Sequence, residues 1–459
     1  MFLEDTIAAI VTASGESGVG IVRISGSKAL SIVNQIFVPK NKNFSLQDNP
    51  RYLVLGHIVD ETHTVDEVLC SYMKAPHSYT TEDVVEINCH GGYQSLKKTL
   101  ELVLKHGARL AERGEFTKRA FLNGRIDLSQ AEAVMDIITA KTGTGHEISQ
   151  KQLDGKLSNT LSQMRDSITE DLAKITVAVD FPEEDEPEVT YQELIDSLDK
   201  TLEQIHKMIA SFEVGKIYRD GLRTVIVGKP NVGKSSLLNG ILHEERAIVT
   251  EIAGTTRDVI EEFFTLDGTP IRLIDTAGIR ETDDVVEKIG VTRSMESIAS
   301  SDLVIHVLDG SRELDREDIE IMDMTEDKRV IAIINKADLE QEIDMDVVAE
   351  RLDPDNTIMA SIKNGQGIEE LIAAIKRMVE IEGLSVDNEY MINNARHKNA
   401  LERAGEACED ALQSLYTGLP LDIIETDFRN IWNILGEITG DTASEDLLNV
   451  IFARFCIGK

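Results

Sequence analysis

The sequence has few cysteines, no long apolar run and no excess of basic residues. Its four cysteines lie far apart without the spacing of a metal site, and a chain of 459 residues needs no disulfides to stabilise its core. No stretch of about 18 apolar residues is present, so no transmembrane helix is expected. The acidic start, residues 1–5, lacks the basic region of a secretory signal. We therefore expect a cytoplasmic protein with reduced thiols and no membrane contact.

Acidic residues strongly outnumber basic ones. Lys and Arg total 47 against 82 for Asp and Glu, which gives a formal net charge of −35. This charge excludes a protein that coats nucleic acid with a general basic surface. If the protein serves a nucleic acid, a local patch or a more basic partner must supply the contacts. At about 100–200 residues per domain, the length predicts two to four domains.

Residues 1–118 mix strand and helix patterns, which predicts an α+β domain. A loop is expected over residues 15–20, and a helix over residues 95–106. The expected strands are residues 6–12, 20–25 and 84–87.

Residues 119–214 are predicted to be helical. They hold little Pro or Gly, and apolar residues recur at helical spacing, as in Leu153, Leu157 and Leu161. Residues 180–188 interrupt the pattern with acidic residues and two prolines. We interpret them as an exposed loop in preference to a metal site, because a charge run alone is unspecific.

Residues 215–382 alternate short apolar strands with helices, which predicts an α/β domain. The helical pattern returns over residues 383–459. We expect an α/β domain inserted into a helical domain, whose two stretches pack together. The expected parallel strands are residues 224–227, 271–274, 303–308 and 330–334.

A phosphate-binding motif opens the α/β part. Residues 228–235, Gly-Lys-Pro-Asn-Val-Gly-Lys-Ser, match the pattern GxxxxGK[ST] between an apolar strand and a predicted helix over 235–242. The glycines let backbone N–H groups curl around phosphate, and the helix N-terminus adds its positive end. We expect Lys234 to reach the β- and γ-phosphates and the Ser235 hydroxyl to ligate Mg²⁺.

Three later segments predict the nucleotide to be GTP. Asp275 would hold Mg²⁺ through water, and the N–H of Gly278 would approach the γ-phosphate. A carboxylate at the end of Asn335-Lys-Ala-Asp338 can accept from both N1–H and the 2-amino group of guanine, a donor pair that adenine lacks. Residues 361–363 would close over the base. In this order, the motifs resemble those of the translation-factor-like GTPases.

Asn231, together with residues 250–256, resembles the potassium-activated GTPases. In those enzymes this Asn and loop oxygens hold K⁺ beside the phosphates, in place of an arginine finger. The resemblance also implies that Thr256 is a second Mg²⁺ ligand beside Ser235. The implied K⁺ ligands are Asn231, Thr250, Ile252 and Thr255.

The residue that orients the attacking water is not the one found in Ras-like GTPases. Ile279 stands where those enzymes have a Gln, so another group must position the water. From the residues alone, Glu287 is best interpreted as a surface helix carboxylate. The resemblance instead makes Glu287 catalytic, polarising the water through a bridging water.

The predicted GTP site therefore combines the phosphate loop, residues 250–256 and the later segments. Its members are Asn231, Val232, Gly233, Lys234, Ser235, Ser236, Thr250, Glu251, Ile252, Ala253, Gly254, Thr255, Thr256, Asp275, Thr276, Ala277, Gly278, Asn335, Lys336, Ala337, Asp338, Ser361, Ile362 and Lys363.

The segments outside the GTPase part resemble one family, that of the tRNA modification GTPase MnmE, also called TrmE. The resemblance runs in order from residue 5 to residue 459. The segments that carry it are residues 18–26, 78–86, 90–92, 114–125 and 130–133, and the terminal Phe-Cys-Ile-Gly-Lys of residues 455–459.

This resemblance implies a function. Family members act with a larger flavin-dependent partner, MnmG (GidA), in a heterotetramer. Together they install an aminomethyl or carboxymethylaminomethyl group at C5 of the wobble uridine, position 34, of certain tRNAs. The carbon comes from methylene-tetrahydrofolate, and the nitrogen from ammonium or glycine. The resemblance also implies a homodimer that pairs through the N-terminal domains.

The N-terminal domain resembles the folate-binding domain of aminomethyltransferases and is implied to hold a 5-formyl-tetrahydrofolate. The implied contacts are Arg23, Glu86, Arg125 and Lys459. A cation can meet the folate glutamyl carboxylate, and a carboxylate can pair with pterin N–H groups. From the residues alone, Arg23 and Glu86 read as strand-end surface charges. Arg125 stands where the family commonly has Lys. The planar guanidinium of Arg presents several N–H donors in a fixed arrangement, whereas the ammonium of Lys acts as a point charge.

Cys456 lies in an apolar run near the C-terminus and by itself predicts a buried core cysteine. The family resemblance makes it a participant in the modification. Two other functions stay open at this stage: a GTP-dependent assembly factor for ribosomes or other RNA, and a folate-dependent aminomethyltransferase in which GTP is only regulatory. The first predicts a basic RNA-binding appendage, which this acidic chain lacks.

Overall fold

The computed structural model describes residues 5–13, 15–61, 63–180, 191–243, 262–266, 268–274, 296–379 and 391–459. The chain divides into two compact units. The first unit combines Met1–Met135 with Leu435–Lys459, and the second unit is Asp136–Ile434. Helices α4 (Leu128–Thr139) and α16 (Leu421–Thr439) each run across one of the two divisions.

The first unit is built on a seven-stranded sheet in the order β3-β4-β5-β6-β2-β1-β7. Neighbouring strands are antiparallel except β1 and β7, which are parallel. Its elements are β1 (Ile7–Ile10), β2 (Ser17–Ser25), α1 (Ala29–Ile36), β3 (Phe37–Pro39), β4 (Val54–Asp60), β5 (His63–Met73), β6 (Val84–Gly91), α2 (Tyr93–Lys105), β7 (Arg109–Leu110), α3 (Glu115–Leu122) and α17 (Glu445–Phe452). The predicted α+β class is confirmed.

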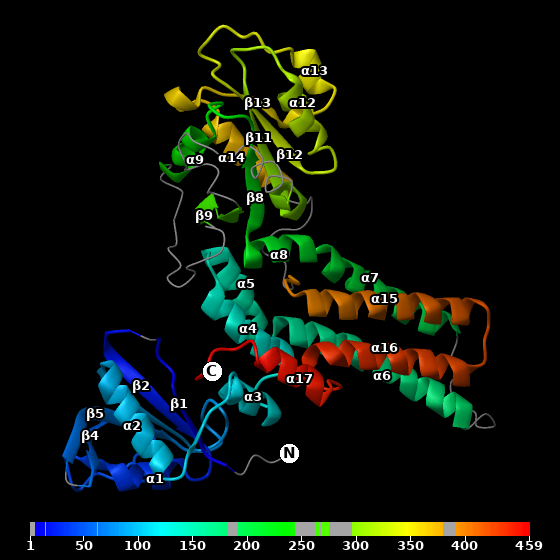
Figure 1. Ribbon diagram of the computed structural model, residues 1–459. Helices are drawn as coiled ribbons and strands as arrows, with labels where there is room; N and C mark the ends of the chain where they lie inside the picture. The colour runs from blue at the N-terminus through cyan, green and yellow to red at the C-terminus, as the bar shows by residue number, and fades with distance from the viewer. Residues whose placement is uncertain are drawn as a thin grey trace. The chain divides into compact units, whose positions relative to one another are not determined.

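Alternation along the strands gives the sheet an apolar and a polar face. In β6, Val85, Ile87 and Cys89 are buried, whereas Glu86 and Asn88 between them are half-buried. The buried residues join one hydrophobic cluster with the apolar stripes of α1 and α2. Both helices therefore cover the same face of the sheet, and α2 lies along it (Figure 1). The opposite face carries Arg23, Glu86 and Asn88, and beside them Ile7 and Ala9 of β1 are buried against Phe116 of α3.

The C-terminal tail is bound to two segments of this unit, residues 113–114 and the end of β1. Arg113 and Ile457 form an antiparallel bridge, and the N–H of Gly114 donates to the carbonyl of Cys456 at 3.3 Å. Gly458 has φ 95°, and a Cβ there would lie 2.7 Å from the carbonyl oxygen of Ile10, so only glycine fits. These contacts hold the last residues against segments that are more than 340 positions away in sequence.

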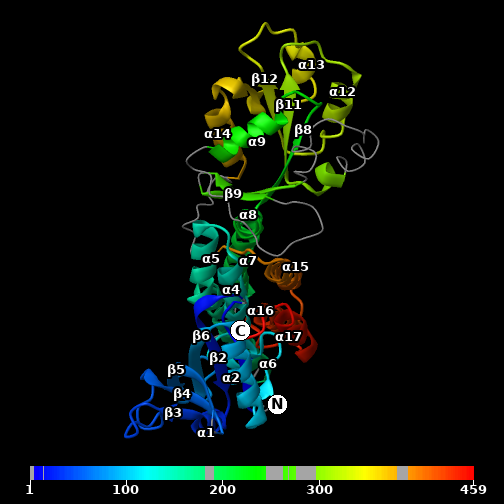
Figure 2. The same cartoon turned by 60° about the vertical axis from the view of Figure 1, so that its left-hand side comes forward.

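The helical part of the second unit comes from both sides of the α/β insertion. Helix α7 packs along α15, where Gly405 allows close approach to Leu202 and Ile205. Trp432 on α16 donates from Nε1 to Thr169 Oγ1 of α6 at 3.1 Å. The predicted packing of the two helical stretches is confirmed, and both views show α7 beside α15 (Figure 2). The helices are α5 (Gly143–Leu153), α6 (Lys156–Asp180), α7 (Tyr191–Ala210), α8 (Phe212–Asp220) and α15 (Ala395–Tyr416).

The α/β part of the second unit has a six-stranded sheet in the order β13-β12-β11-β8-β10-β9. All neighbours are parallel except β10 and β9, so the four predicted parallel strands are confirmed. The antiparallel edge strand β9 and the short β13 were not predicted. The elements are β8 (Leu222–Val227), α9 (Lys234–His243), β9 (Glu262–Leu266), β10 (Thr269–Leu273), β11 (Leu303–Asp309), α12 (Arg316–Asp323), β12 (Val330–Asn335), α13 (Met345–Ala349), β13 (Thr357–Met359) and α14 (Ile368–Val379), with 3₁₀ turns at Pro354–Asn356 and Ile362–Asn364.

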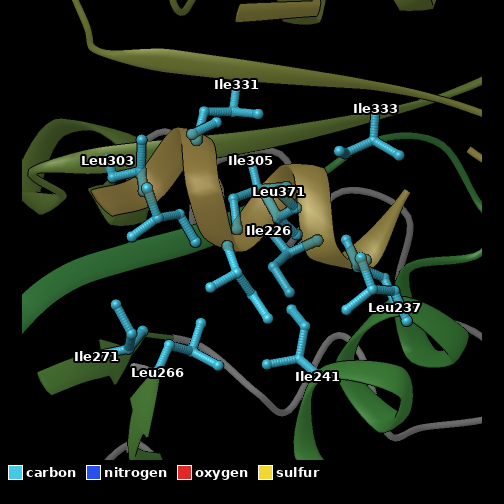
Figure 3. Close-up of a cluster of buried hydrophobic side chains, with 14 of the residues drawn as sticks. Ile226, Leu237, Ile241, Leu266, Ile271, Leu303, Ile305, Ile331, Ile333 and Leu371 are labelled. Carbon is cyan, nitrogen blue, oxygen red and sulfur yellow. The ribbon is translucent and has the colours of Figure 1, made fainter. Parts of the chain in front are cut away.

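This sheet carries the hydrophobic core of the α/β part. Ile226, Ile305 and Ile333 come from adjacent strands and meet Leu237 of α9 and Leu371 of α14 (Figure 3). All of them are buried. Burial of each such side chain contributes about 1.5–3 kcal/mol. The core therefore fixes the carboxyl ends of the strands, where β8 and β12 lead into the predicted nucleotide motifs.

Three local expectations need correction. Residues 17–20 belong to β2 and not to a loop, because Ser17 and Gly20 pair with Gly91 and Cys89 across a register shift. Leu153 and Leu157 lie on different helices, since Gly155, at φ 85°, separates α5 from α6. Asp180 ends α6, and the rest of the predicted acidic loop lies outside the described residues. Within the described ranges, no helix is long and apolar enough to cross a bilayer.

A buried histidine makes the stability of this sheet depend on pH. His306 of β11 is fully buried, and neither ring nitrogen has a hydrogen-bond partner among the described residues. Burial lowers the pKa of His306 to about 4, although the Asp318 carboxylate opposes this shift. The folded chain therefore excludes a proton that the unfolded chain binds below pH 6.5. Stability is present above that pH and is lost as the pH falls toward 4.

We predict that His306→Leu removes this pH dependence. In the wild-type protein, protonation of His306 on unfolding should lower the free energy of unfolding of this sheet by about 3 kcal/mol between pH 7 and pH 4. The variant should not show this decrease. Hydrogen exchange of β11 peptides in urea, compared between the two proteins at both pH values, measures the difference. Both proteins contain the same carboxylates, so the pH dependence that these groups contribute cancels in the comparison. Equal losses of protection would contradict the prediction.

Candidate functional site

The phosphate loop joins β8 to α9, and two of its glycines admit no side chain. Gly228 has φ 140°, and a Cβ there would lie 2.3 Å from the carbonyl oxygen of Val307. Gly233 has φ 111°, and a Cβ there would lie 2.2 Å from the Asn335 side-chain nitrogen. Both positions combine a left-handed backbone with close approach, as a loop that cradles phosphate requires. Helix α9 begins at Lys234, one residue earlier than predicted.

The Lys234 ammonium lies folded over its own loop. It donates to the carbonyl oxygens of Gly228 and Lys229, each at 2.7 Å. Lys234 has no carboxylate partner among the described residues, and burial lowers the pKa of its ammonium. A partly desolvated cation without a counter-ion gains strongly from an arriving phosphate. The geometry therefore suits the predicted role of Lys234.

Asn335 connects the phosphate loop to the segments that are predicted to bind the base. Its side-chain N–H₂ donates to the carbonyl of Val232 at 2.7 Å, and its Oδ1 accepts from the N–H of Ile362 at 3.1 Å. The residue is buried, so removal of its side chain would leave two polar backbone groups unsatisfied. Asn335 thus acts as a brace within the site.

The predicted guanine-reading carboxylate is oriented by the 361–363 segment. Ser361 donates from its hydroxyl to Asp338 Oδ1 at 2.6 Å. This hydrogen bond lowers the pKa of Asp338, so the carboxyl is ionised and acts only as an acceptor. Asp338 faces solvent, where a base can reach it. Three of the predicted segments therefore meet in one place.

Asp309, at the end of β11, is a further site residue that sequence reasoning missed. The Lys336 ammonium donates to Asp309 Oδ2 at 2.5 Å, which orients the lysine of the 335–338 motif. Burial alone would raise the pKa of Asp309, but hydrogen bonds from Lys336 and Ser311 outweigh it and hold the pKa below its usual value. The available signal was an acidic residue directly after a buried strand.

Several predicted nucleotide and metal residues lie outside the described residues. They are Thr250, Glu251, Ile252, Ala253, Gly254, Thr255, Thr256, Asp275, Thr276, Ala277, Gly278 and Glu287. Of the predicted K⁺ ligands, Asn231 is described, in the left-handed conformation at φ 63° that asparagine tolerates better than most residues. Of the predicted Mg²⁺ ligands, Ser235 is described, in the first turn of α9.

A second cluster of charged residues lies on the polar face of the first unit's sheet. Arg23 of β2 and Glu86 of β6 are register partners, and Arg23 Nε donates to Glu86 Oε1 at 2.8 Å. Their side chains are 15% and 22% exposed, so they are not strand-end surface charges. The guanidinium carbons of Arg23 and Arg125 lie 5.3 Å and 4.8 Å from the ring centre of Tyr79. Tyr79 therefore links two predicted folate contacts.

The C-terminal tail brings the remaining predicted residues to this cluster. Burial and the charge of Arg23 lower the pKa of Lys459, whereas Cys456 and Glu86 oppose this shift. Lys459 thus lies within electrostatic reach of all three. The interpretation of Cys456 as a buried core residue is wrong, because its side chain is exposed, whereas the other three cysteines are buried and free. Phe455, the residue before it, is buried.

Comparison with known proteins covers both units. The family model described as "MnmE helical domain" matches residues 128–456, and the model described as "GTP-binding protein TrmE N-terminus" matches residues 6–125. A protein named tRNA modification GTPase MnmE from Clostridioides difficile (strain 630) is 54% identical, with 100% of both chains covered. The chain belongs to the MnmE family. A relative of the same name from Alkaliphilus metalliredigens (strain QYMF) is 52% identical, again over 100% of both chains.

MnmE family membership agrees with the predicted architecture of an N-terminal α+β domain, a helical domain and a P-loop GTPase domain. A solved structure, the G domain of the T. maritima FeoB iron transporter, is 26% identical over 34% of this chain and 98% of its own. The TM-score of this match is 0.26.

Proposed function

We propose that this chain is a potassium-activated GTPase that, together with a flavoprotein of the MnmG (GidA) type, modifies C5 of the wobble uridine of certain tRNAs. The group added is aminomethyl or carboxymethylaminomethyl, with a tetrahydrofolate derivative as one-carbon donor. As a member of the MnmE family, the chain is a tRNA modification GTPase. The 54% identity over the whole chain carries the proposal, because it includes both ends as well as the GTPase part.

The nucleotide site fits GTP and Mg²⁺. The glycine cradle and the Lys234 ammonium offer donors to phosphate, and Asp338 offers an ionised acceptor to guanine. In the proposal, Ser235 and Thr256 would hold Mg²⁺, which would supply positive charge to balance the phosphates. Asp275 would hold the ion through water, and Glu287 would polarise the attacking water.

Potassium is proposed to take the place of an arginine finger beside the phosphates. Asn231 supports this part, since it occupies the phosphate loop, and Ile279 offers no side chain that could orient water. Thr250, Ile252 and Thr255 complete the proposed ligand set.

We predict that K⁺ stimulates GTP hydrolysis and Na⁺ does not. The expected stimulation is at least about tenfold at equal ionic strength, since an arginine finger itself contributes about 10³–10⁵ in turnover. Steady-state phosphate release in KCl and NaCl measures it, and Asn231→Ala should remove the difference. Equal turnover in the two salts would refute the proposed K⁺ site.

The charged cluster of the first unit fits a folate. Arg125, which lies against Tyr79, is a cation that a glutamyl carboxylate can meet, and Lys459 adds positive charge beside Arg23. Glu86 binds Arg23 through Oε1, and its Oε2 has no partner among the described residues, so it can accept from pterin N–H groups. A bound tetrahydrofolate would supply the one-carbon unit. Cys456 is part of the proposal as an exposed thiol on the same tail as Lys459, and no specific step is assigned to it.

We predict that Arg23→Ala abolishes the wobble modification while GTP turnover stays within about twofold, because the residue lies in the other unit from the nucleotide site. Nucleoside mass spectrometry of tRNA measures the modification in cells that carry only the variant gene. Lys98→Gln, which removes a charge from exposed α2 on the opposite face of the sheet, is the matched control and should keep it. Unchanged tRNA in cells lacking the gene altogether would favour the RNA assembly-factor alternative.

The proposal includes a homodimer, a heterotetramer with the flavoprotein, tRNA as substrate and a cytoplasmic place of action. The net charge of −35 supports a partner that carries most tRNA contacts. We retain 1–118, 119–214, 215–382 and 383–459 as proposed domain limits.

A further inference from the structure

An open groove of about 470 Å³ lies beside the charged cluster of the first unit. Its lining includes Arg51, Leu53, Met73, His77 and Arg125, together with Tyr79. Among the residues that the structure describes, no acidic residue lines the groove, although the sequence contains 82 of them. The groove is therefore a local basic site on a strongly acidic protein.

The two arginines of the groove keep their charge available. Arg51 donates from Nη2 to the carbonyl of His77 at 3.4 Å, and Arg125 donates from Nη1 to the carbonyl of Tyr79 at 2.8 Å. Neither has a carboxylate partner among the described residues. By contrast, Arg23 and Arg119 of the same unit are both paired with carboxylates. A guanidinium bonded only to a carbonyl retains N–H groups in the geometry that suits a carboxylate.

The groove leads away from the proposed folate site. Arg125 and Arg23 both lie against the Tyr79 ring, and Arg23 binds Glu86. Arg51 enters the groove from the segment before β4, where its backbone N–H donates to the carbonyl of Tyr72 at 2.7 Å. Leu53 and Met73 add apolar lining to the groove.

We propose that this groove binds the glutamyl tail of a polyglutamylated folate, with Arg51 contacting carboxylates beyond the first glutamate. The inference rests on the proposed folate site. Each added glutamyl residue brings one carboxylate for a guanidinium and methylenes that contact Leu53 and Met73. The phosphates of RNA are the other polyanion to consider. The groove favours the folate tail because it is continuous with the folate cluster and has apolar walls.

The test compares two probes, 5-formyl-tetrahydrofolate with one glutamate and with three, by calorimetry on the full-length chain. The wild-type chain should bind the triglutamate about five- to tenfold more tightly, as expected for exposed charge pairs. Arg51→Gln should reduce this preference to about twofold or less and leave the monoglutamate Kd unchanged. Arg51→Lys should keep most of the preference, and Lys98→Gln, on the opposite face, should keep all of it.

The outcomes separate the two proposals. If the wild-type chain binds neither probe, the folate site and the groove both fail. If it binds both probes equally, or if Arg51→Gln weakens both equally, the folate site stands and the tail site is refuted. If Arg51→Gln leaves the triglutamate preference intact and weakens tRNA binding in a filter assay, the groove serves RNA and the proposal is overturned.

Discussion

Lys234→Ala is expected to lower the turnover of GTP by at least about a hundredfold, comparable to the loss of one donor that stabilises developing charge in a transition state. Among the residues that the structure describes, the Lys234 ammonium is bonded to two carbonyls of the phosphate loop and to no carboxylate. It can therefore leave these carbonyls for the β- and γ-phosphates without breaking an ion pair to any of those residues. Alanine provides no positive charge at that point, and the developing charge on the phosphates is then poorly balanced.

The matched control is Lys229→Ala, which removes the same charge from the same loop. The Lys229 ammonium instead pairs with Asp315, the N-cap of α12, and with Glu317. The Lys229→Ala substitution is therefore expected to change the turnover of GTP by about threefold or less. Single-turnover hydrolysis at saturating GTP measures both variants, and circular dichroism checks that each is folded. Comparable turnover in Lys234→Ala and the wild type would exclude the proposed role.

Asp338→Asn is expected to change the base specificity of the nucleotide site from guanine to xanthine. The carboxylate accepts from both guanine N1–H and the 2-amino group, whereas an asparagine can accept only through its oxygen. Its N–H₂ would face the guanine amino group, so two donors would meet. Xanthine has a carbonyl at C2 and can accept that N–H₂ while its own N1–H donates. The affinity for GTP should fall more than about a hundredfold, as for a site whose polar groups lose their partners.

Competition between GTP and xanthosine triphosphate in the hydrolysis assay measures the exchange. Ser361→Ala is the companion variant, because it removes the hydrogen bond that orients Asp338 but keeps the carboxylate. Ser361→Ala should weaken the binding of GTP only several-fold, and the site should still prefer guanine to xanthine. If Asp338→Asn still prefers GTP to xanthosine triphosphate, another residue reads the base.

The fold of the α/β part could be predicted from sequence because its strands are continuous apolar runs. Such runs occur where a strand is buried on both faces, as β11 is over all its residues. The edge strand β9 gave no such signal. In the first unit, β2 and β6 extend beyond their apolar stretches, because pairing between Ser17 and Gly91 depends on the neighbouring strand and not on either segment alone.

The chemistry of the nucleotide site was already decided by the sequence. A loop that cradles phosphate needs glycines at fixed spacing, and recognition of guanine needs a carboxylate in the segment that follows a strand. Both features are short sequence patterns, so the sequence alone is enough to predict them. The tertiary structure decided which groups support that chemistry. Asn335 braces two loops, Asp309 holds Lys336, and Tyr79 joins two arginines far apart in sequence. It also placed Cys456 at the surface. Burial and charge pairing at these positions depend on contacts between distant segments, and local patterns do not contain them.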